Sequence, residues 1–111
     1  MKFWDTVDRL FAGANMLVNR SAGSAHPRYP DMIYPLDYGY LENTQGGDGD
    51  GIDVFVGTSL GGERVVGALA TVDAVKRDME LKLLVNCTED EMDVAFAFLD
   101  SNFMGVLRLD R

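Results

Sequence analysis

The first apolar residues of the chain recur at the spacing of an α-helix. The positions that share one face of that helix are Phe3, Trp4, Val7, Leu10 and Phe11. This period predicts an amphipathic helix that packs on the rest of the domain and ends near Gly13. The polar face carries more acidic than basic residues, which disfavours a lipid surface as the partner of this helix.

A second helix is predicted near the C-terminus. Thr88 and Glu91 stand three positions apart just before an apolar run, which is the spacing of a capping box. The apolar residues from 92 to 99 continue at helical spacing. We therefore expect this helix to begin after Thr88 and to stop near Asn102.

Short apolar runs, several of them rich in β-branched residues, predict extended segments elsewhere in the chain. These runs are 16–19, 32–34, 39–41, 54–56, 65–72, 81–85 and 106–109. The polar loop between runs 65–72 and 81–85 is typical of a hairpin. The sequence contains no internal repeat and no linker, so residues 1–111 are predicted to form one domain. Its predicted class is α+β, mainly β.

Composition and charge narrow the possible functions. The chain is 47% hydrophobic, which favours a globular domain over disorder. Its net charge of −8 argues against nucleic acid and anionic membranes as partners. No export signal is visible, because Asp5, Asp8 and Arg9 interrupt the N-terminal apolar run. The single Cys87 cannot form an internal disulfide, so we expect a cytoplasmic protein.

The most informative segment is a glycine-rich acidic loop that leads into an apolar strand. It places Asp48, Asp50 and Asp53 within six residues. Glycine allows the sharp turns that let neighbouring carboxylates converge, and oxygen ligands suit hard cations such as Mg²⁺, Mn²⁺ or Ca²⁺. The alternative is an ordinary solvated Asp-Gly turn. An EF-hand is disfavoured, because counting from Asp48 puts Asp53 where the turn glycine should be.

Two motifs taken together resemble the signature of a known family. The segment Tyr34-Pro35-Leu36-Asp37-Tyr38-Gly39-Tyr40 is followed, after a spacer, by Asp48-Gly49-Asp50-Gly51-Ile52-Asp53-Val54. This string resembles that of the soluble, Mg²⁺-dependent inorganic pyrophosphatases of family I. The resemblance implies a small five-stranded, OB-like barrel flanked by an N-terminal and a C-terminal helix. The family usually has proline at position 51, and glycine there is expected to loosen the loop without removing a ligand.

A second segment is similar to the same family. The run 66–73 leads through a polar loop to Asp78, and the family carries two metal-binding aspartates at this spacing. The resemblance implies that Asp48, Asp53 and Asp78 hold paired Mg²⁺ ions, with Mn²⁺ as a possible substitute. Asp73 would help to bind a further ion that arrives with the substrate.

The resemblance also implies the catalytic groups and the phosphate ligands. Asp50 would act as the general base, and Tyr38 would donate a hydrogen bond to a phosphate oxygen. Arg20 matches a phosphate-binding arginine if 18–20 is aligned with the family's V-D-R strand. Arg28 would instead replace a lysine if 23–29 is aligned with its G-S-x-N-K-Y segment. Both alignments remain open at this point.

The sequence departs from the family at several positions near the expected site. Glu80 stands where the family usually has lysine, and Lys82, one strand period later, could substitute from the same face. Neither alignment supplies the family's glutamates, and its Tyr-Lys pair near the C-terminus is also missing. His26 has no evident acid or base partner in the sequence, so it is predicted to be a loop residue without a catalytic role.

Three functions follow from these observations. The first is Mg²⁺-dependent hydrolysis of pyrophosphate to two phosphates by a metal-activated water. The second is hydrolysis of another phosphoanhydride, such as a nucleoside or sugar diphosphate, in a more open pocket. The third is a non-catalytic relative that binds metal or phosphate. Self-association into a homo-oligomer is expected because family members show it.

Overall fold

The computed structural model describes residues 2–47, 49–101 and 103–111, so the predicted ligand Asp48 lies outside the described residues. The elements, in chain order, are α1 (Lys2–Ala12), β1 (Met16–Arg20), β2 (Asp37–Leu41), β3 (Ile52–Val56), β4 (Val65–Asp73), β5 (Asp78–Val85), α2 (Glu89–Leu99) and β6 (Met104–Asp110). The expected class, mainly β with one helix near each end, is confirmed. In the part of the chain that the structure describes, no helix is long and apolar enough to cross a membrane.

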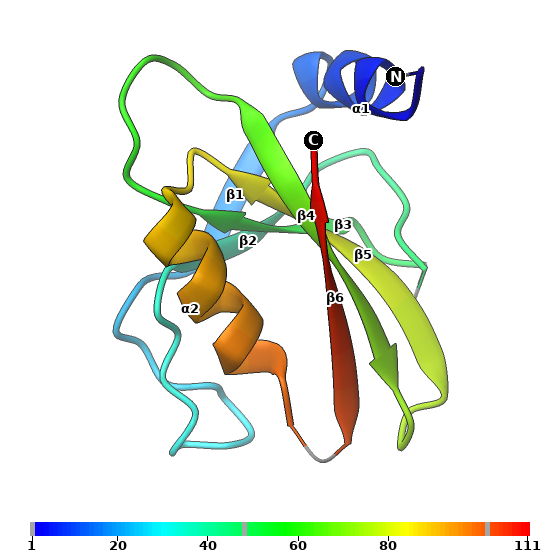
Figure 1. Cartoon of the computed structure of the whole chain (residues 1–111). Coiled ribbons are helices and arrows are strands. Elements are labelled where there is room, and N and C mark those ends of the chain that lie inside the picture. The colour runs from blue at the N-terminus through cyan, green and yellow to red at the C-terminus, as the bar shows by residue number, and fades with distance from the viewer. Residues whose placement is uncertain (1, 48, 102) are drawn as a thin grey trace.

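One sheet contains all the strands, in the order β1-β2-β3-β5-β4-β6 (Figure 1). Neighbouring strands are antiparallel, except that β3 and β5 are parallel. Among the described residues the sheet has six strands, and β1 and β6 are its two unpaired edges. The expected five-stranded barrel is therefore corrected to an open, twisted six-stranded sheet.

The N-terminal helix covers one face of the sheet. Trp4 is buried in a cluster with Leu41 and Val54, and Val7 and Phe11 pack against it. Only part of the predicted apolar face of α1 is buried, since Phe3 and Leu10 on this face are each 43% exposed to solvent. A helix that contacts a sheet along a narrow line can bury only part of a wide apolar stripe.

Arg111 attaches α1 to the sheet. Its guanidinium donates to both carboxylate oxygens of Asp8 at 2.7 and 2.8 Å and to the carbonyl of Val65 at 2.9 Å. It also lies 5.2 Å from the centre of the Trp4 ring. A paired guanidinium–carboxylate contact fixes both groups, so the last described residue orients the first helix.

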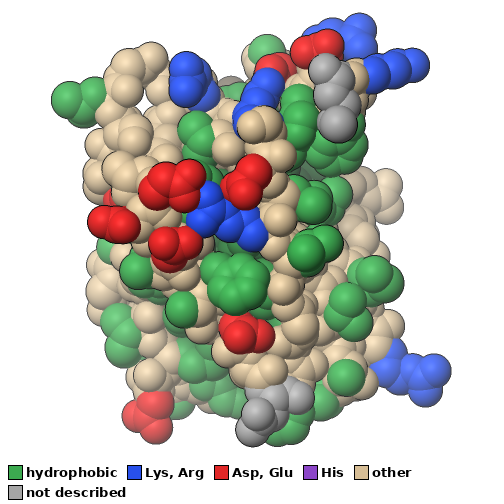
Figure 2. Space-filling model, in the orientation of Figure 1, with side chains coloured by type: hydrophobic (Ala, Val, Ile, Leu, Met, Phe, Trp, Pro, Cys, Tyr) green, Lys and Arg blue, Asp and Glu red, His purple; other side chains and the backbone are tan. Residues whose placement is uncertain are grey.

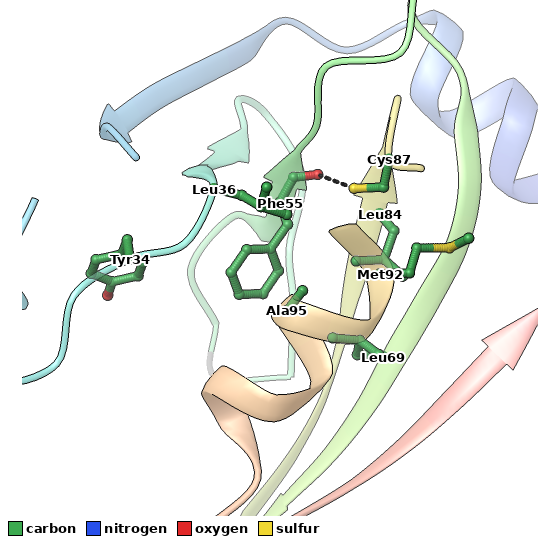
Figure 3. Close-up of a cluster of buried hydrophobic side chains, with 8 residues drawn as sticks. All are labelled: Tyr34, Leu36, Phe55, Leu69, Leu84, Cys87, Met92 and Ala95. Carbon is green, nitrogen blue, oxygen red and sulfur yellow. Dashed lines mark hydrogen bonds between the residues drawn. The ribbon is translucent and has the colours of Figure 1, made fainter. Parts of the chain in front are cut away.

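The C-terminal helix covers the opposite face. The predicted capping box is present, because the Thr88 hydroxyl accepts from the Glu91 N–H and the Glu91 carboxylate accepts from the Thr88 N–H. Figure 3 shows Met92 and Ala95 of α2 directed toward the buried side chains of the sheet. It also shows the Cys87 thiol donating a hydrogen bond to the Phe55 carbonyl. Burial raises the pKa of the Cys87 thiol to about 12, so it stays protonated.

The glycine of the Tyr38-Gly39-Tyr40 motif lets two strands approach closely. A Cβ built on Gly39 would lie 1.9 Å from the Leu17 carbonyl oxygen. The pairing of β1 with β2 is irregular here, shifting between Val18, which opposes Gly39, and Arg20, which opposes Tyr38. The absence of a side chain at position 39 thus brings Arg20 beside Tyr38.

Candidate functional site

A buried lysine lies at the centre of the candidate site. Lys82 Nζ is 2.8 Å from Asp53 Oδ2, 2.9 Å from Glu80 Oε2 and 3.0 Å from the Tyr38 hydroxyl oxygen. Its side chain is only 8% exposed. The ammonium is also 5.6 Å from the centre of the Tyr38 ring. A charge at this depth persists only when it is neutralised and hydrogen-bonded, and these contacts do both.

The electrostatics of this group keep both Lys82 and Tyr38 protonated. Burial alone would lower the pKa of Lys82, but its contacts with Tyr38 and Asp53 outweigh burial and raise that pKa above the ordinary value. Burial also raises the pKa of the Tyr38 hydroxyl, although Lys82 acts in the opposite direction. Near neutral pH the tyrosine is therefore a hydrogen-bond donor, and the lysine remains a cation.

Strand periodicity explains how these side chains meet. Asp78, Glu80 and Lys82 are two residues apart along β5 and share one face of the strand. Asp53 enters from β3 and Tyr38 from β2. The parallel pairing of β3 with β5 begins one residue beyond Asp53 and Lys82, at Val54 and Leu83. The sequence prediction that Lys82 shares the face of Glu80 is thus confirmed.

The acidic loop is held against β5 at its glycines. The Gly46 N–H donates to the Asp50 carbonyl at 2.6 Å, and the Gly49 N–H donates to the Gly46 carbonyl at 3.1 Å. A Cβ on Gly47 would lie 2.5 Å from the Met79 carbonyl oxygen. The backbone of the loop therefore approaches the strand segment that carries Glu80.

Gly51 lies where the acidic loop passes close to β2. A Cβ at this position would lie 2.8 Å from both the Leu41 carbonyl oxygen and the Tyr40 ring. Here the backbone passes so close to β2 that only glycine fits without a shift. Glycine at this position thus permits the close contact between loop and strand, and the expected loosening of the loop stays a prediction.

We expect Gly51→Ala to lower the free energy of unfolding by about 1–3 kcal/mol, because the new methyl group overpacks this contact. Chemical denaturation of both proteins measures the difference. Gly13→Ala is the matched control, since the nearest atom to a Cβ there is 4.0 Å away. Equal losses in the two variants would contradict the close contact at Gly51.

The two later aspartates meet as the sequence predicted. Asp73 and Asp78 are direct partners across the β4–β5 hairpin. Asp73 Oδ1 also accepts from the N–H groups of Val75 and Lys76, both at 2.9 Å. Asp73 therefore stabilises the turn that separates it from Asp78.

The structure distinguishes the two candidate arginines. Arg20 Nη1 donates to the Tyr34 hydroxyl at 2.5 Å, and the Tyr34 ring lies 5.2 Å from the Tyr38 ring. Arg28 is exposed in the loop between β1 and β2. Of these two cations, Arg20 is the one brought beside Tyr38 by strand pairing.

His26 organises the loop that carries Arg28. Its Nδ1 accepts from the N–H groups of Arg28 at 3.0 Å and Tyr29 at 3.3 Å. Burial, and then the neighbouring charge of Arg20, lowers the pKa of His26. These contacts give the histidine a structural role in the loop where the sequence placed it, and the expectation that it has no catalytic role stays a prediction.

Arg108 is a basic residue on β6, in the C-terminal region where the family's Tyr-Lys pair is missing. It forms ion pairs with acidic residues of α2 and β6. Its guanidinium donates to Asp93 and Asp110, at 2.8 Å each, and to Glu89. Figure 2 shows a basic side chain enclosed by acidic ones over this part of the surface. Arg108 therefore links the helix to the edge strand.

The carboxylate oxygens of the predicted metal ligands suit a hard divalent cation. Asp53, Asp73 and Asp78 offer carboxylate oxygens, and the close approach of Gly47 to β5 brings the acidic loop to the same strand. Among the described side chains, no three acidic, histidine or cysteine residues are grouped closely enough to hold a metal ion. Four of the five predicted carboxylates, Asp50, Asp53, Asp73 and Asp78, are described, and no three of them form such a group. Asp48 lies outside the described residues, so the predicted metal site stays a prediction.

Two residues at the site were not assigned from sequence. The sequence identifies Glu80 only as a departure from the family and Tyr34 only as the first residue of the motif. The alternation of Asp78, Glu80 and Lys82 was the signal that could have identified Glu80. The spacing of residues in the sequence does not indicate that the Arg20 guanidinium donates a hydrogen bond to the Tyr34 hydroxyl.

Comparison with known proteins identifies the family of this chain. The sequence profile of the family described as inorganic pyrophosphatase matches residues 20–101. The inorganic pyrophosphatase of Geobacillus stearothermophilus is 40% identical over 60 residues, which cover 48% of this chain and 36% of that protein. The corresponding protein of Halalkalibacterium halodurans is 38% identical over 69 residues, covering 56% of this chain and 41% of that protein. The aligned segments thus span well under half the length of these relatives.

Solved structures show the same fold at low sequence identity. The inorganic pyrophosphatase of Helicobacter pylori has a TM-score of 0.65 and 18% identity, covering 86% of this chain and 83% of that chain. That of Coxiella burnetii has a TM-score of 0.65 and 17% identity, covering 86% and 84%. Since the family profile matches well over half of the residues, the chain belongs to the inorganic pyrophosphatase family.

Proposed function

We propose that the chain hydrolyses inorganic pyrophosphate to two phosphates in a reaction that depends on Mg²⁺, with Mn²⁺ as a substitute. The observation that carries this proposal is the contact of one buried lysine, Lys82, with both Tyr38 and Asp53. This group joins two of the motif residues that define the family resemblance. A protonated tyrosine beside a fixed cation and a carboxylate suits the binding of a phosphate anion with its metal.

The proposed metal ligands are Asp48, Asp53 and Asp78 for the paired ions, with Asp73 for an ion that arrives with the substrate. A divalent ion at these carboxylates supplies charge neutralisation of phosphate oxygens and acidification of water. The oxygen-only chemistry of these side chains supports Mg²⁺ over zinc or copper.

Asp50 is proposed to accept the proton of the attacking water. Its main-chain carbonyl accepts a hydrogen bond from the Gly46 N–H, which fixes the backbone of the loop at this residue. Tyr38 is proposed to donate to a phosphate oxygen. Its oxygen accepts from Lys82, an ammonium that can only donate, and its phenolic proton interacts with the Asp53 carboxylate. Donation to a phosphate oxygen would replace that contact with Asp53.

Three cations are proposed to hold the phosphate groups. Lys82 lies between Tyr38 and Asp53, and Arg20 reaches Tyr34 beside them. Arg28 would act from the exposed loop between β1 and β2. Fixed positive charges of this kind stabilise the charge that develops during phosphoryl transfer.

The location and assembly of the protein are part of the same proposal. We propose that it acts in the cytoplasm, on a small-molecule substrate, as a homo-oligomer without nucleic-acid or membrane partners. The net charge of −8 supports the exclusion of nucleic acid and anionic membranes.

The direct test is phosphate release from pyrophosphate, with Mg²⁺ and with chelator. We expect release only with Mg²⁺, and faster release from pyrophosphate than from a nucleoside diphosphate. Faster release from the nucleoside diphosphate would assign the site to another phosphoanhydride. Thermal stabilisation by Mg²⁺ without any phosphate release would indicate a non-catalytic metal-binding relative.

A further inference from the structure

Glu80 and Asp53 both form an ion pair with the Lys82 ammonium. Lys82 Nζ is 2.9 Å from Glu80 Oε2 and 2.8 Å from Asp53 Oδ2, so one ammonium contacts two carboxylates at once. The Glu80 side chain is 14% exposed and that of Asp53 is 25% exposed. Both carboxylates are therefore shielded enough from water for their charges to act strongly on Lys82.

Mg²⁺ binding would change this balance. A carboxylate that binds a divalent ion no longer neutralises a neighbouring ammonium fully. Suppose that Asp53 were the only acidic partner of Lys82. Once Asp53 bound Mg²⁺, the buried lysine charge would lie beside a doubly charged cation with no carboxylate of its own. An unpaired buried charge is costly, so the site needs a second acid near Lys82.

We propose that Glu80 is this second acid. It is a positioning residue that neutralises the Lys82 ammonium and keeps it in place when Asp53 binds Mg²⁺. The proposal rests on the proposed function and adds to it a residue without an assigned role. Glu80 and Lys82 are two positions apart on the same face of β5, so the ammonium keeps this partner without a backbone change. The pair explains how this chain accommodates glutamate where the family usually has lysine.

A double-substitution cycle tests this role through metal affinity. The Mg²⁺ dissociation constant is measured by calorimetry for the wild type, Glu80→Gln, Lys82→Gln and the double variant. We expect Glu80→Gln alone to raise the constant about tenfold, within the usual range of coupling between sites. With Lys82→Gln already present, Glu80→Gln should change it by about twofold or less, because no cation remains to be neutralised.

The controls separate charge balance from folding and from direct ligation. Glu63→Gln, on the exposed loop before β4, removes the same charge elsewhere and should leave Mg²⁺ affinity unchanged. Glu80→Asp should recover most of the affinity, since it restores the carboxylate. The melting temperature of each metal-free variant shows whether it is folded.

Each other outcome overturns the inference. Unchanged affinity in Glu80→Gln, in a protein that still releases phosphate with Mg²⁺, would remove the role of Glu80 and leave the proposed function intact. A tenfold loss that persists in the Lys82→Gln background would make Glu80 a metal ligand instead. Absence of Mg²⁺ binding by the wild type would overturn both this inference and the proposed function.

Discussion

Asp50→Asn is expected to lower the rate of Mg²⁺-dependent phosphate release from pyrophosphate by about two to four orders of magnitude, the usual contribution of a general base. The amide has nearly the same shape as the carboxylate but cannot accept a proton from water at neutral pH. The hydrogen bond that closes the loop at this residue uses the Asp50 carbonyl, which the substitution preserves. We therefore expect a loss of kcat in a protein that remains folded, which its melting curve shows.

The control for this variant is Asp5→Asn, which removes one carboxylate from the exposed side of α1. It should retain the wild-type rate. Steady-state kinetics at saturating Mg²⁺, with calorimetric melting of both variants, separates chemistry from folding. Full activity in Asp50→Asn would refute its role as the base, and an equal loss in Asp5→Asn would indicate a general effect of charge.

Gly39→Ala is expected to destabilise the fold more than any other glycine substitution considered above. Its Cβ would lie 1.9 Å from the Leu17 carbonyl oxygen and 2.8 Å from the Val18 Cα, and both of these are backbone atoms. A side-chain rotation cannot relieve such a clash, so β1 must move away from β2. We expect the free energy of unfolding to fall by about 4 kcal/mol, at the upper end for single substitutions.

Gly105→Ala provides the matched comparison, because Gly105 is also in a strand and no atom lies within 4 Å of its added Cβ. This variant should be as stable as the wild type, or more stable by about 0.5 kcal/mol through reduced freedom of the unfolded chain. Urea denaturation followed by circular dichroism measures both. If Gly39→Ala unfolds at the same urea concentration as Gly105→Ala, the close approach of β1 to β2 is wrong.

Local sequence patterns determined the elements of this protein well. The capping box at Thr88 and Glu91 predicted the start of α2, and the polar loop between two apolar runs predicted the β4–β5 hairpin. These features depend on residues close together in the chain, so their physical causes are visible without the fold. The pairing of Asp73 with Asp78 followed from the hairpin for the same reason.

The family resemblance extended the prediction to the site. Tyr38, Asp53 and Lys82 were all named from sequence, and the structure brings them together. One expectation required correction, the five-stranded barrel. It depended on which strands become neighbours, which no local pattern specifies.

The sequence by itself determined the kinds of elements, the acidic motif and the presence of a lysine on the face of β5. Only the tertiary structure decided that this lysine contacts Asp53, Glu80 and Tyr38 together, and that Arg20 is the arginine paired opposite Tyr38. The physical reason is that these contacts join β1, β2, β3 and β5, whose pairing is set by non-local packing. A strand pattern shows which face a side chain occupies, whereas the neighbouring strands decide which charges it meets there.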